Sequence, residues 1–241
     1  ISNFSIYPDD LLYQRTDGIR IFADEVEISD NYIYNTIIGI YLKNSSNTNI
    51  KRNIISNNKI AMSSYINTYN NLYENNYFLN NSDSGISFFY EYNSDFLSNY
   101  FLKNNNFALN LMRSENNTIQ NNIINDSSQG GIRFENSNNN IVKNNNLCNN
   151  SNFGFFIFSS DFNEIKNNNI KNHTTAINVS TDSISNIIVD NLFLNNLYDI
   201  KQNENKNNNN NNNDSNLRLY IIVLIVFISL IILGFYLIKK K

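Results

Sequence analysis

The sequence has few of the residues that carry metal, redox and disulfide chemistry. Its 241 residues include one Cys, one His, two Met and no Trp. A single cysteine, Cys148, excludes an internal disulfide and cannot report the redox compartment. A specific copper site needs clustered His, Met or Cys side chains, whereas His173, Met62 and Met112 are spread along the chain. We therefore expect no metal site and no cofactor.

Proline, glycine and basic residues are also scarce. The only proline is Pro8, and the seven glycines include one adjacent pair, Gly130-Gly131, so calcium-binding nonapeptide repeats are absent. Residues 1–216 hold 14 basic and 21 acidic residues, a formal charge of −7. Nucleic-acid binding needs a basic footprint, and we therefore expect no nucleic-acid partner.

The chain contains instead a repeat of about 23 residues. An apolar residue is followed three positions later by Asn and five positions later by a second apolar residue, in eight copies. The first apolar positions are Ile28, Ile50, Leu72, Phe96, Ile119, Val142, Ile165 and Ile188. The Asn positions are Asn31, Asn53, Asn75, Asn99, Asn122, Asn145, Asn168 and Asn191. The second apolar positions are Ile33, Ile55, Tyr77, Phe101, Ile124, Leu147, Ile170 and Phe193.

A second set of columns keeps the same period. Gly or Ala precedes an apolar residue once per copy, as in Gly39-Ile40 and Gly131-Ile132. Apolar residues alternate within these short segments, which indicates strands with one buried face. A period near 23 residues without any helical pattern indicates stacked β coils. We predict an all-β solenoid of about eight coils over residues 1–200, about 40 Å long, in which residues 1–16 form a partial coil.

The recurring Asn has a physical role in such a stack. Its side chain can accept a backbone donor where a coil bends, and Asn tolerates left-handed backbone geometry. Amides at the same place in successive coils can also hydrogen-bond to one another as a ladder. We therefore predict that the eight Asn positions of the repeat form one structural ladder.

The pattern resembles the right-handed parallel β-helix repeat family. The resemblance rests on segments such as Gly39-Ile40-Tyr41-Leu42 followed by residues 49–55, Asn-Ile-Lys-Arg-Asn-Ile-Ile, and it covers roughly residues 1–200. That family includes pectate-lyase-like sugar-active proteins and NosD-like periplasmic copper-binding proteins. The resemblance implies the right-handed parallel β-helix fold, but the same repeat carries lyases, hydrolases and non-catalytic surface proteins.

The chain changes character after residue 200. Residues 201–216 contain no apolar residue and include seven consecutive Asn, which predicts a disordered linker. The 20 residues from Leu219 to Ile238 carry no charge, so we predict a single transmembrane α-helix over 217–238. Lys239, Lys240 and Lys241 form a basic tail, which the positive-inside rule places in the cytoplasm. The β-helix would then lie outside the cytoplasm, with the membrane as a partner.

Acidic and basic residues on the coils are candidates for polysaccharide chemistry. Glycoside cleavage needs paired carboxylates or a positioned base. Only Glu115 and Asp161 share an offset in the repeat, and two coils separate them, about 10 Å, which is far for a retaining pair. We name Glu115 and Asp161 as catalytic candidates, with Arg113 and Arg133 as binders of sugar carboxylates. The further carboxylates that might line one face are Glu91 and Glu135.

Aromatic residues expected on the outer faces give a second, non-catalytic hypothesis. Tyr41, Tyr90 and Tyr92 are candidate carbohydrate-binding residues, because aromatic rings stack on sugars. Phe89 and Phe156 occupy similar positions. We favour a membrane-anchored surface protein whose β-helix binds carbohydrate or cell-envelope components, or serves a structural role, without catalysis. The alternatives are a membrane-tethered polysaccharide lyase or hydrolase and, third, a NosD-like copper-accessory protein.

Overall fold

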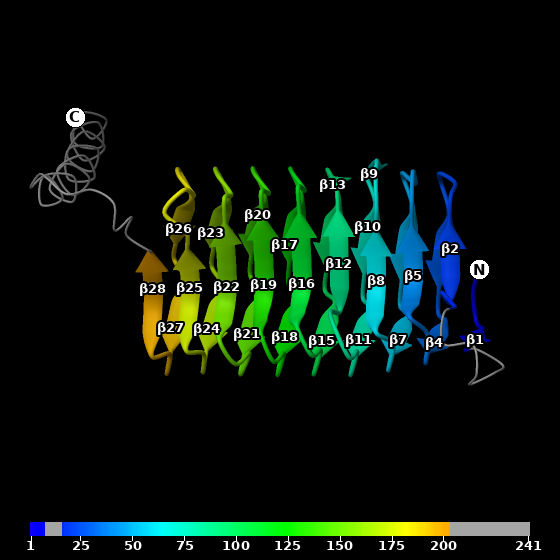
Figure 1. The fold of residues 1–241 in the computed structure, drawn as a ribbon, viewed down its shortest axis with the longest axis horizontal. Coiled ribbons are helices and arrows are strands. Elements are labelled where there is room, and N and C mark those ends of the chain that lie inside the picture. The colour runs from blue at the N-terminus through cyan, green and yellow to red at the C-terminus, as the bar shows by residue number, and fades with distance from the viewer. Residues whose placement is uncertain (8–15, 203–241) are drawn as a thin grey trace, which may run out of the picture. The chain divides into compact units, whose positions relative to one another are not determined.

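The computed structural model describes residues 1–7 and 16–202, which form a parallel β-helix with three sheets along its length (Figure 1). Each coil contributes one strand to each sheet, and every strand pairs in parallel with its counterparts in the adjacent coils. Sheet A contains β3 (Glu27–Ser29), β6 (Asn49–Lys51), β10 (Leu72–Glu74), β14 (Asp95–Leu97), β17 (Thr118–Gln120), β20 (Ile141–Lys143), β23 (Glu164–Lys166) and β26 (Ile187–Val189).

The other two sheets have nine strands each. Sheet B contains β1 (Ser5–Ile6), β4 (Tyr32–Tyr34), β7 (Ile54–Ser56), β11 (Tyr77–Leu79), β15 (Tyr100–Leu102), β18 (Ile123–Asn125), β21 (Asn146–Cys148), β24 (Asn169–Lys171) and β27 (Leu192–Leu194). Sheet C contains β2 (Ile19–Ile21), β5 (Ile38–Leu42), β8 (Ile60–Ser64), β12 (Ile86–Phe89), β16 (Phe107–Met112), β19 (Gly130–Glu135), β22 (Phe153–Phe158), β25 (Thr175–Val179) and β28 (Tyr198–Gln202). A short fourth sheet pairs β9 (Thr68–Tyr69) with β13 (Glu91–Tyr92).

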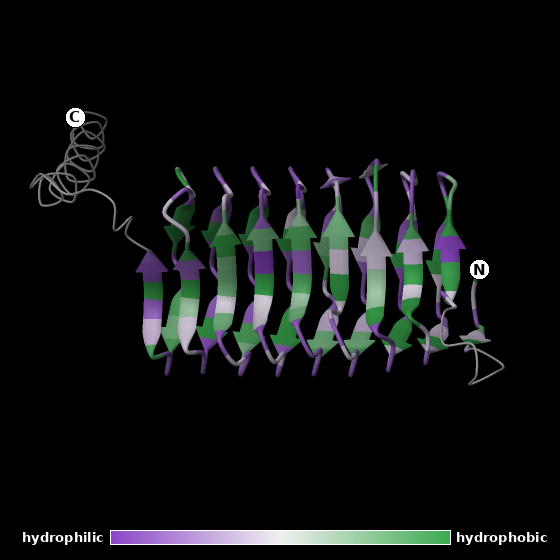
Figure 2. Cartoon of the chain, viewed as in Figure 1, coloured by the Kyte–Doolittle hydropathy of each residue, from purple (hydrophilic) through white to green (hydrophobic). Residues whose placement is uncertain are grey.

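The core is filled by the apolar columns that the repeat predicts. Residues alternate along the strands between apolar and polar types (Figure 2), and the apolar members point inward. Ile119 and Ile124 are fully buried, as are Ile132 and Phe134 on the next strand of sheet C. Because the period is close to 23 residues, each inward side chain lies on its counterpart in the neighbouring coil.

One coil departs from the predicted register. The inward residues of that coil are Tyr73 and Phe78, which are fully buried, and not Leu72 and Tyr77. Tyr77 is instead 48% exposed. Both choices satisfy an apolar pattern, but the Tyr73 hydroxyl donates to Glu91 Oε1 at 2.9 Å inside the core. This polar contact gives the tyrosine a buried partner and explains the one-residue shift.

The column of Gly and Ala has small residues because successive coils approach closely there. A Cβ atom at Gly39 would lie 2.5 Å from the Ala61 carbonyl oxygen and 2.5 Å from Ile55 Cγ2. The reason is steric crowding against the next coil and not backbone conformation, since none of the described glycines has a positive φ.

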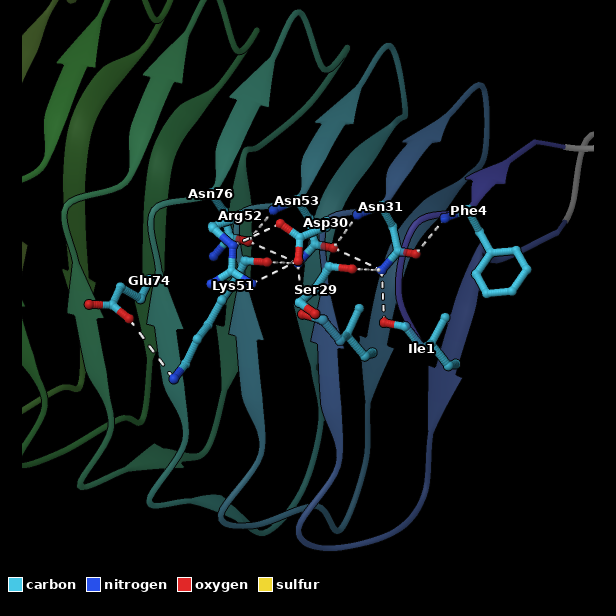
Figure 3. Close-up of polar contacts among 11 residues, drawn as sticks. Ile1, Phe4, Ser29, Asp30, Asn31, Lys51, Arg52, Asn53, Glu74 and Asn76 are labelled. Atoms are coloured by element: carbon cyan, nitrogen blue, oxygen red, sulfur yellow. Dashed lines mark hydrogen bonds and ion pairs between the residues drawn. The ribbon is translucent and has the colours of Figure 1, made fainter.

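The predicted Asn column lies at the corner between sheets A and B. Asn99 is typical: its Oδ1 accepts the Asn76 backbone N–H at 2.9 Å and the Asn76 side-chain amide at 3.1 Å. Its own Nδ2 donates to the Tyr73 carbonyl and to Asn122 Oδ1. Figure 3 shows the beginning of the column, Asn31, Asn53 and Asn76. The column members are Asn31, Asn53, Asn76, Asn99, Asn122, Asn145, Asn168 and Asn191.

Asn75 is therefore a correction to the predicted column. It is exposed and has a φ of 55°, whereas Asn76 is fully buried and makes the ladder contacts. The two positions have different requirements: the outer one needs left-handed backbone, and the inner one needs an amide that donates and accepts. Asparagine meets both requirements. The adjacent pair Asn75-Asn76 therefore does not show which of the two belongs to the inner column.

Two further buried polar columns flank the first, five residues before and five residues after it. The earlier column lies between sheets C and A, and the later one between sheets B and C. Neither was predicted, although the spacing is visible in the sequence. The earlier column is Thr48, Asn71, Ser94, Asn117, Asn140, Asn163 and Asn186. The later column is Thr36, Asn58, Asn81, Asn104, Ser127, Asn150, His173 and Asn196.

The first residues form the partial coil that the sequence predicts. β1 pairs with β4, and the Phe4 N–H donates to Asn31 Oδ1 at 3.1 Å (Figure 3). β28 ends at Gln202, two residues beyond the predicted boundary at 200. The predicted transmembrane segment 217–238 and the basic tail lie outside the described residues. Within 1–7 and 16–202 there is no helix that could cross a membrane.

Candidate functional site

A hollow opens where the strands of sheet C end, across four adjacent coils. It has a volume of about 290 Å³. We call it the sheet C hollow. Its lining residues are Tyr65, Phe89, Tyr90, Met112, Arg113, Glu135 and Asn136. A larger hollow of about 430 Å³ lies at the first coils, but its charged side chains Asp30 and Arg52 are already paired at 2.7 Å (Figure 3).

The backbone at the sheet C hollow is left-handed where each strand of sheet C ends. Ile66 and Asn67 after β8, and Asn136 after β19, have left-handed backbone, with φ of 64°, 49° and 49°. The two coils between them place Tyr90 and Arg113 there, with φ of 59° and 51°. Large side chains in this region cost about 1–2 kcal/mol relative to ordinary backbone. Large residues hold left-handed positions at other corners as well, at Arg52, Lys103 and Phe162.

Tyr90 and Arg113 contact each other across adjacent coils. Arg113 Nη1 donates to Tyr90 Oη at 2.5 Å, and the guanidinium carbon lies 5.7 Å from the centre of the Tyr90 ring. The hydrogen bond to Tyr90 raises the pKa of Arg113, which stays cationic. No ion pair among the described residues involves Arg113. Its other N–H groups can donate to an external anion.

A second aromatic cluster lies beside the hollow on the outer face of sheet C. The rings of Phe153 and Phe156 are 5.1 Å apart, and Phe156 also stacks on Phe158. Arg133 lies over the Phe107 ring at 5.9 Å and forms an ion pair with Glu135. Unlike Arg113, Arg133 therefore has its charge already matched. Asn110, the neighbour of Arg133 in register, is buried with an Oδ1 atom that has no hydrogen-bond partner.

The three tyrosines predicted to bind carbohydrate lie in different places. Tyr90 lines the sheet C hollow. Tyr41 is on the same sheet two coils earlier, where its ring meets Phe22 at 6.3 Å. Tyr92 lies on β13, beside Glu115 of the next coil. Burial and then the Glu115 charge raise the pKa of Tyr92.

Glu115 and Asp161 lie two coils apart in one row, outside the hollow. Asn138 lies between them: its Nδ2 donates to Glu115 Oε1 at 3.4 Å, and its Oδ1 accepts the Asp161 N–H at 2.8 Å. Asp161 Oδ1 in turn accepts the Ile184 N–H at 2.7 Å. Both carboxylates thus take part in contacts between coils. Arg113 is in the hollow and Arg133 beside it, so neither arginine shares a site with this carboxylate pair.

Glu91, considered a surface acid from the sequence, lies in the core and is fully buried. Its Oε1 accepts hydrogen bonds from Tyr73, Asn71 and Ser94, while Oε2 has no partner. Burial raises the pKa of Glu91. Serine holds the same position in the following coils, at Ser114 and Ser137. Because the residues at this inward position are polar, the apolar pattern does not mark it as inward.

The single histidine is also structural. His173 takes the place of an asparagine in the column between sheets B and C, with ring contacts of 3.2 Å to Asn150 and Asn196. Burial lowers its pKa to about 4. The described residues contain no group of three His, Cys, Asp or Glu side chains suited to a metal ion.

Comparison with protein families and solved structures identifies the fold. The family model described as a right-handed β-helix region matches residues 1–113 and 70–193. The chain belongs to the right-handed β-helix family. The predicted resemblance is thereby confirmed. A comparison with curated proteins finds no match.

Several solved β-helices are similar to this one. The mannuronan C-5 epimerase AlgE6 A-module of Azotobacter vinelandii is 14% identical with a TM-score of 0.66, over 77% of this chain and 62% of its own. The periplasmic alginate epimerase AlgG is 17% identical with a TM-score of 0.55, over 83% of this chain and 55% of its own. The Streptococcus pneumoniae surface protein and adhesin PfbA is 14% identical, over 74% and 49%, with a TM-score of 0.49. At these identities the likeness shows the fold alone. The chain spans less than two thirds of each of these three proteins.

Tyr65 and Met112 are members of the hollow that sequence reasoning missed. A signal was available: residues 65, 89, 112 and 135 recur at about the repeat period just past the apolar segment of sheet C. The pattern of inward residues does not show which outward residues gather around a hollow.

Proposed function

We propose that this β-helix is a non-catalytic binding module for carbohydrate, with the sheet C hollow as its site. The observation that supports this most is the contact between Tyr90 and Arg113, whose Oη and Nη1 atoms lie 2.5 Å apart in the hollow. Tyr90 is half-buried. A partly exposed ring beside hydrogen-bond donors is the combination that binds a sugar, because the ring covers the apolar C–H face while the donors meet oxygen atoms.

The charges around the hollow favour carboxylated sugars. Arg113 has no carboxylate partner among the described side chains, so a sugar carboxylate can accept two parallel hydrogen bonds from its guanidinium. The similar folds named for mannuronan and alginate support testing polyuronates first. Neutral sugars would use the rings of Tyr65, Phe89 and Tyr90 but would leave this cation unmatched.

The ionisable groups of the hollow argue for binding over hydrolysis. Glu135 is the one carboxylate that lines it, and Glu135 is paired with Arg133. Glycoside hydrolysis by two carboxylates needs a second acid about 5–10 Å away across the sugar, and Glu115 and Asp161 are not among the lining residues. We therefore propose recognition, without bond cleavage, as the activity of this surface.

The proposed setting is a membrane surface. The uncharged segment 217–238 and the basic tail that follows support a single span with the C-terminus in the cytoplasm. The β-helix would then meet glycans or envelope components outside the cytoplasm. Reaction of the whole cell with a membrane-impermeant thiol reagent tests this. Cys148, on the outer side of sheet B, is labelled in intact cells if the proposal holds, and only after lysis if it is wrong.

A carbohydrate array tests the proposed binding. The full chain in detergent micelles is compared with Tyr90→Ala and with Tyr77→Ala, a matched variant whose exposed ring lies on sheet B. We expect retention of polyuronates, loss of at least about tenfold in affinity with Tyr90→Ala, and no change with Tyr77→Ala. Absence of binding across the array, or equal loss in both variants, would refute the proposal.

A second candidate function is polysaccharide cleavage by a proton-transfer mechanism. Beside the Arg113 cation, Tyr90 in its phenolate form can take the proton next to the carboxylate of a bound uronate, while the glycosidic C–O bond breaks and solvent water protonates the leaving oxygen. Incubation of the chain with a panel of polyuronates would release unsaturated or reducing ends in that case. Tyr90→Phe would abolish such release while it retained binding. Release of no product, together with retained binding, supports the non-catalytic proposal.

A further inference from the structure

The last coil exposes the apolar interior of the solenoid. Ile200 continues the core column of sheet C below Ile177, yet it is 52% exposed. Ile188 and Phe193, the last members of the columns in sheets A and B, are only partly buried. At the other end of the described coils, the end members of the columns are Ile28, which is fully buried, Ile19, which is 6% exposed, and Ile6, which is partly buried. The exposed aliphatic residues on strands of the last coil are Ile187, Val189, Leu192, Leu194 and Ile200.

Among residues 1–7 and 16–202, no strand pairs with the outer edges of the last coil. The Tyr198 N–H donates to the Thr174 carbonyl at 3.0 Å, so Tyr198, Ile200 and Gln202 turn their backbone groups toward β25. Because consecutive residues of a strand turn these groups to opposite sides, Asp199 and Lys201 turn theirs to the open edge.

In β26 and β27, the last strands of sheets A and B, one residue each directs its backbone N–H and C=O groups to the open edge. The Ile187 and Leu192 N–H groups donate to Asn163 and Asn168 at 2.8 Å. By the same alternation, Ile188 and Phe193 face the open edge with their backbone groups. An edge of this kind is a template for another strand.

We propose that the last coil is an interface for a second copy of this chain, joined end to end about a twofold axis. The axis passes through Ile200, so that the two β28 strands run antiparallel with each Ile200 opposite the other. Asp199 of one copy then lies opposite Lys201 of the second copy. The twofold axis generates a second, identical pair from Lys201 of the first copy and Asp199 of the second.

Two independent features of β28 select this one register. The backbone groups free at the edge are those of Asp199 and Lys201, and residues that face each other in a hydrogen-bonded antiparallel pair exchange both N–H···O bonds. The same alignment brings opposite charges together on the outer face, which stabilises a cross-strand pair. A register centred on Asp199 or on Lys201 would instead oppose like charges.

The other two sheets fit the same axis. Sheets A and B both end in three-residue strands, and the twofold places β26 of one copy against β27 of its partner. Ile188 then lies opposite Phe193, the residues whose backbone groups are free. The side chains around them, Ile187 and Val189 against Leu194 and Leu192, are all aliphatic. Every strand of the last coil thus has a complementary strand in the second copy.

Other occupants fit this end less well. A lipid surface offers no partners for the N–H and C=O groups of the three strand edges. Residues 203–216 of the chain contain no apolar residue to cover Ile200. Segment 217–238 is apolar apart from Arg218, Ser229 and Gly234, and it lacks the alternation of a strand with one buried face. A second copy supplies both the apolar face and the strand edges.

Disulfide trapping tests the proposed contact in the full chain in detergent micelles. In a Cys148→Ser background, Ile200→Cys would place two thiols at opposed antiparallel positions about 4.5 Å apart at Cα, within the range of a disulfide. We expect a covalent dimer on mild oxidation. Ser63→Cys, on the outer face of an interior coil of sheet C, is the matched control and should stay monomeric on a denaturing gel.

Charge reversal tests the register. Asp199→Lys alone, or Lys201→Asp alone, places like charges opposite each other twice and should raise the dimer dissociation constant at least about tenfold. The double variant restores both pairs and should restore association. The mass is measured by analytical ultracentrifugation over a range of concentrations. A monomeric wild-type chain would overturn the proposal. So would a dimer that responds to none of these changes, because its contact would then lie elsewhere, for example in segment 217–238.

Discussion

At the scale of single residues, two ionisable side chains stand inside columns that otherwise hold neutral polar groups. Glu91 replaces a serine of the following coils, and His173 replaces an asparagine. Each keeps hydrogen bonds to its neighbours, so the column continues. Burial raises the pKa of Glu91 and lowers the pKa of His173 to about 4, so both are held toward their neutral forms. Their contributions to stability therefore change with pH in opposite directions.

His173 makes the fold less stable in mild acid. Its pKa falls from 6.5 to about 4 on folding, so between these values the unfolded chain binds a proton that the folded chain does not. Stability is lost as pH falls through this window, by up to about 3 kcal/mol. His173→Asn, which restores the amide of the column, should remove this loss. Urea unfolding at pH 7 and pH 4.5 measures it, and an equal loss in both proteins would contradict the assignment.

Glu91 acts in the other direction. Because its pKa is raised, the folded chain holds the proton more tightly than the unfolded chain. The contribution of protonated Glu91 to the free energy of unfolding is fully present below the ordinary pKa of glutamate, about 4.3. It is lost as the pH rises above that value. Glu91→Gln should therefore raise the melting temperature at pH 8 and change it little at pH 4. Glu27→Gln on the exposed face of sheet A is the control, and a Glu91→Gln protein less stable than wild type at pH 8 would contradict the assignment.

At the scale of the structural elements, the repeat predicts the strands and the core because side chains at one place in every coil meet the same environment. Ile28, Ile50 and Phe96 could be assigned inward from spacing alone. The slip to Leu72 and Asn75 arose where both candidate residues fit the pattern. A step of 23 residues back from Phe96 and Asn99 gives Tyr73 and Asn76, and the contact between Tyr73 and Glu91 fits that register. The flanking columns were predictable, since their members recur five residues on either side of the first.

The inner and outer asparagines of one corner should respond differently to substitution. Asn122 is buried and bonds to coils on both sides. Asn122→Ala leaves the Asn99 N–H and the Phe96 carbonyl without partners, so we expect a loss of about 2–4 kcal/mol. Asn121, with a φ of 58°, needs only left-handed backbone, and Asn121→Gly should change stability by less than about 0.5 kcal/mol. Equal costs in chemical denaturation would show that the column does not hold the coils together.

At the scale of the whole molecule, the sequence predicts the stack better than the site. A column of the core recurs in each of eight coils, so its spacing is visible in the sequence, whereas the residues of a site occur only once. Tyr90 and Arg113 were named separately from the sequence, but their contact depends on the corner where adjacent coils bring them together. Tyr41, Glu115 and Asp161 do not line that hollow. The repeat gave their positions along the rows of the solenoid, but it did not give the shape of the surface. The surface is thus a product of the stacking and not of any one segment.

The central claim is that the sheet C hollow binds a carboxylated sugar through Arg113, and calorimetric titration tests it most directly. A polyuronate oligosaccharide and a neutral oligosaccharide of equal length are titrated into the full chain and into Arg113→Gln. We predict that wild type prefers the polyuronate, and that Arg113→Gln weakens its binding by about tenfold or more without changing the neutral titration. Equal affinity of the two proteins for the polyuronate would contradict the account.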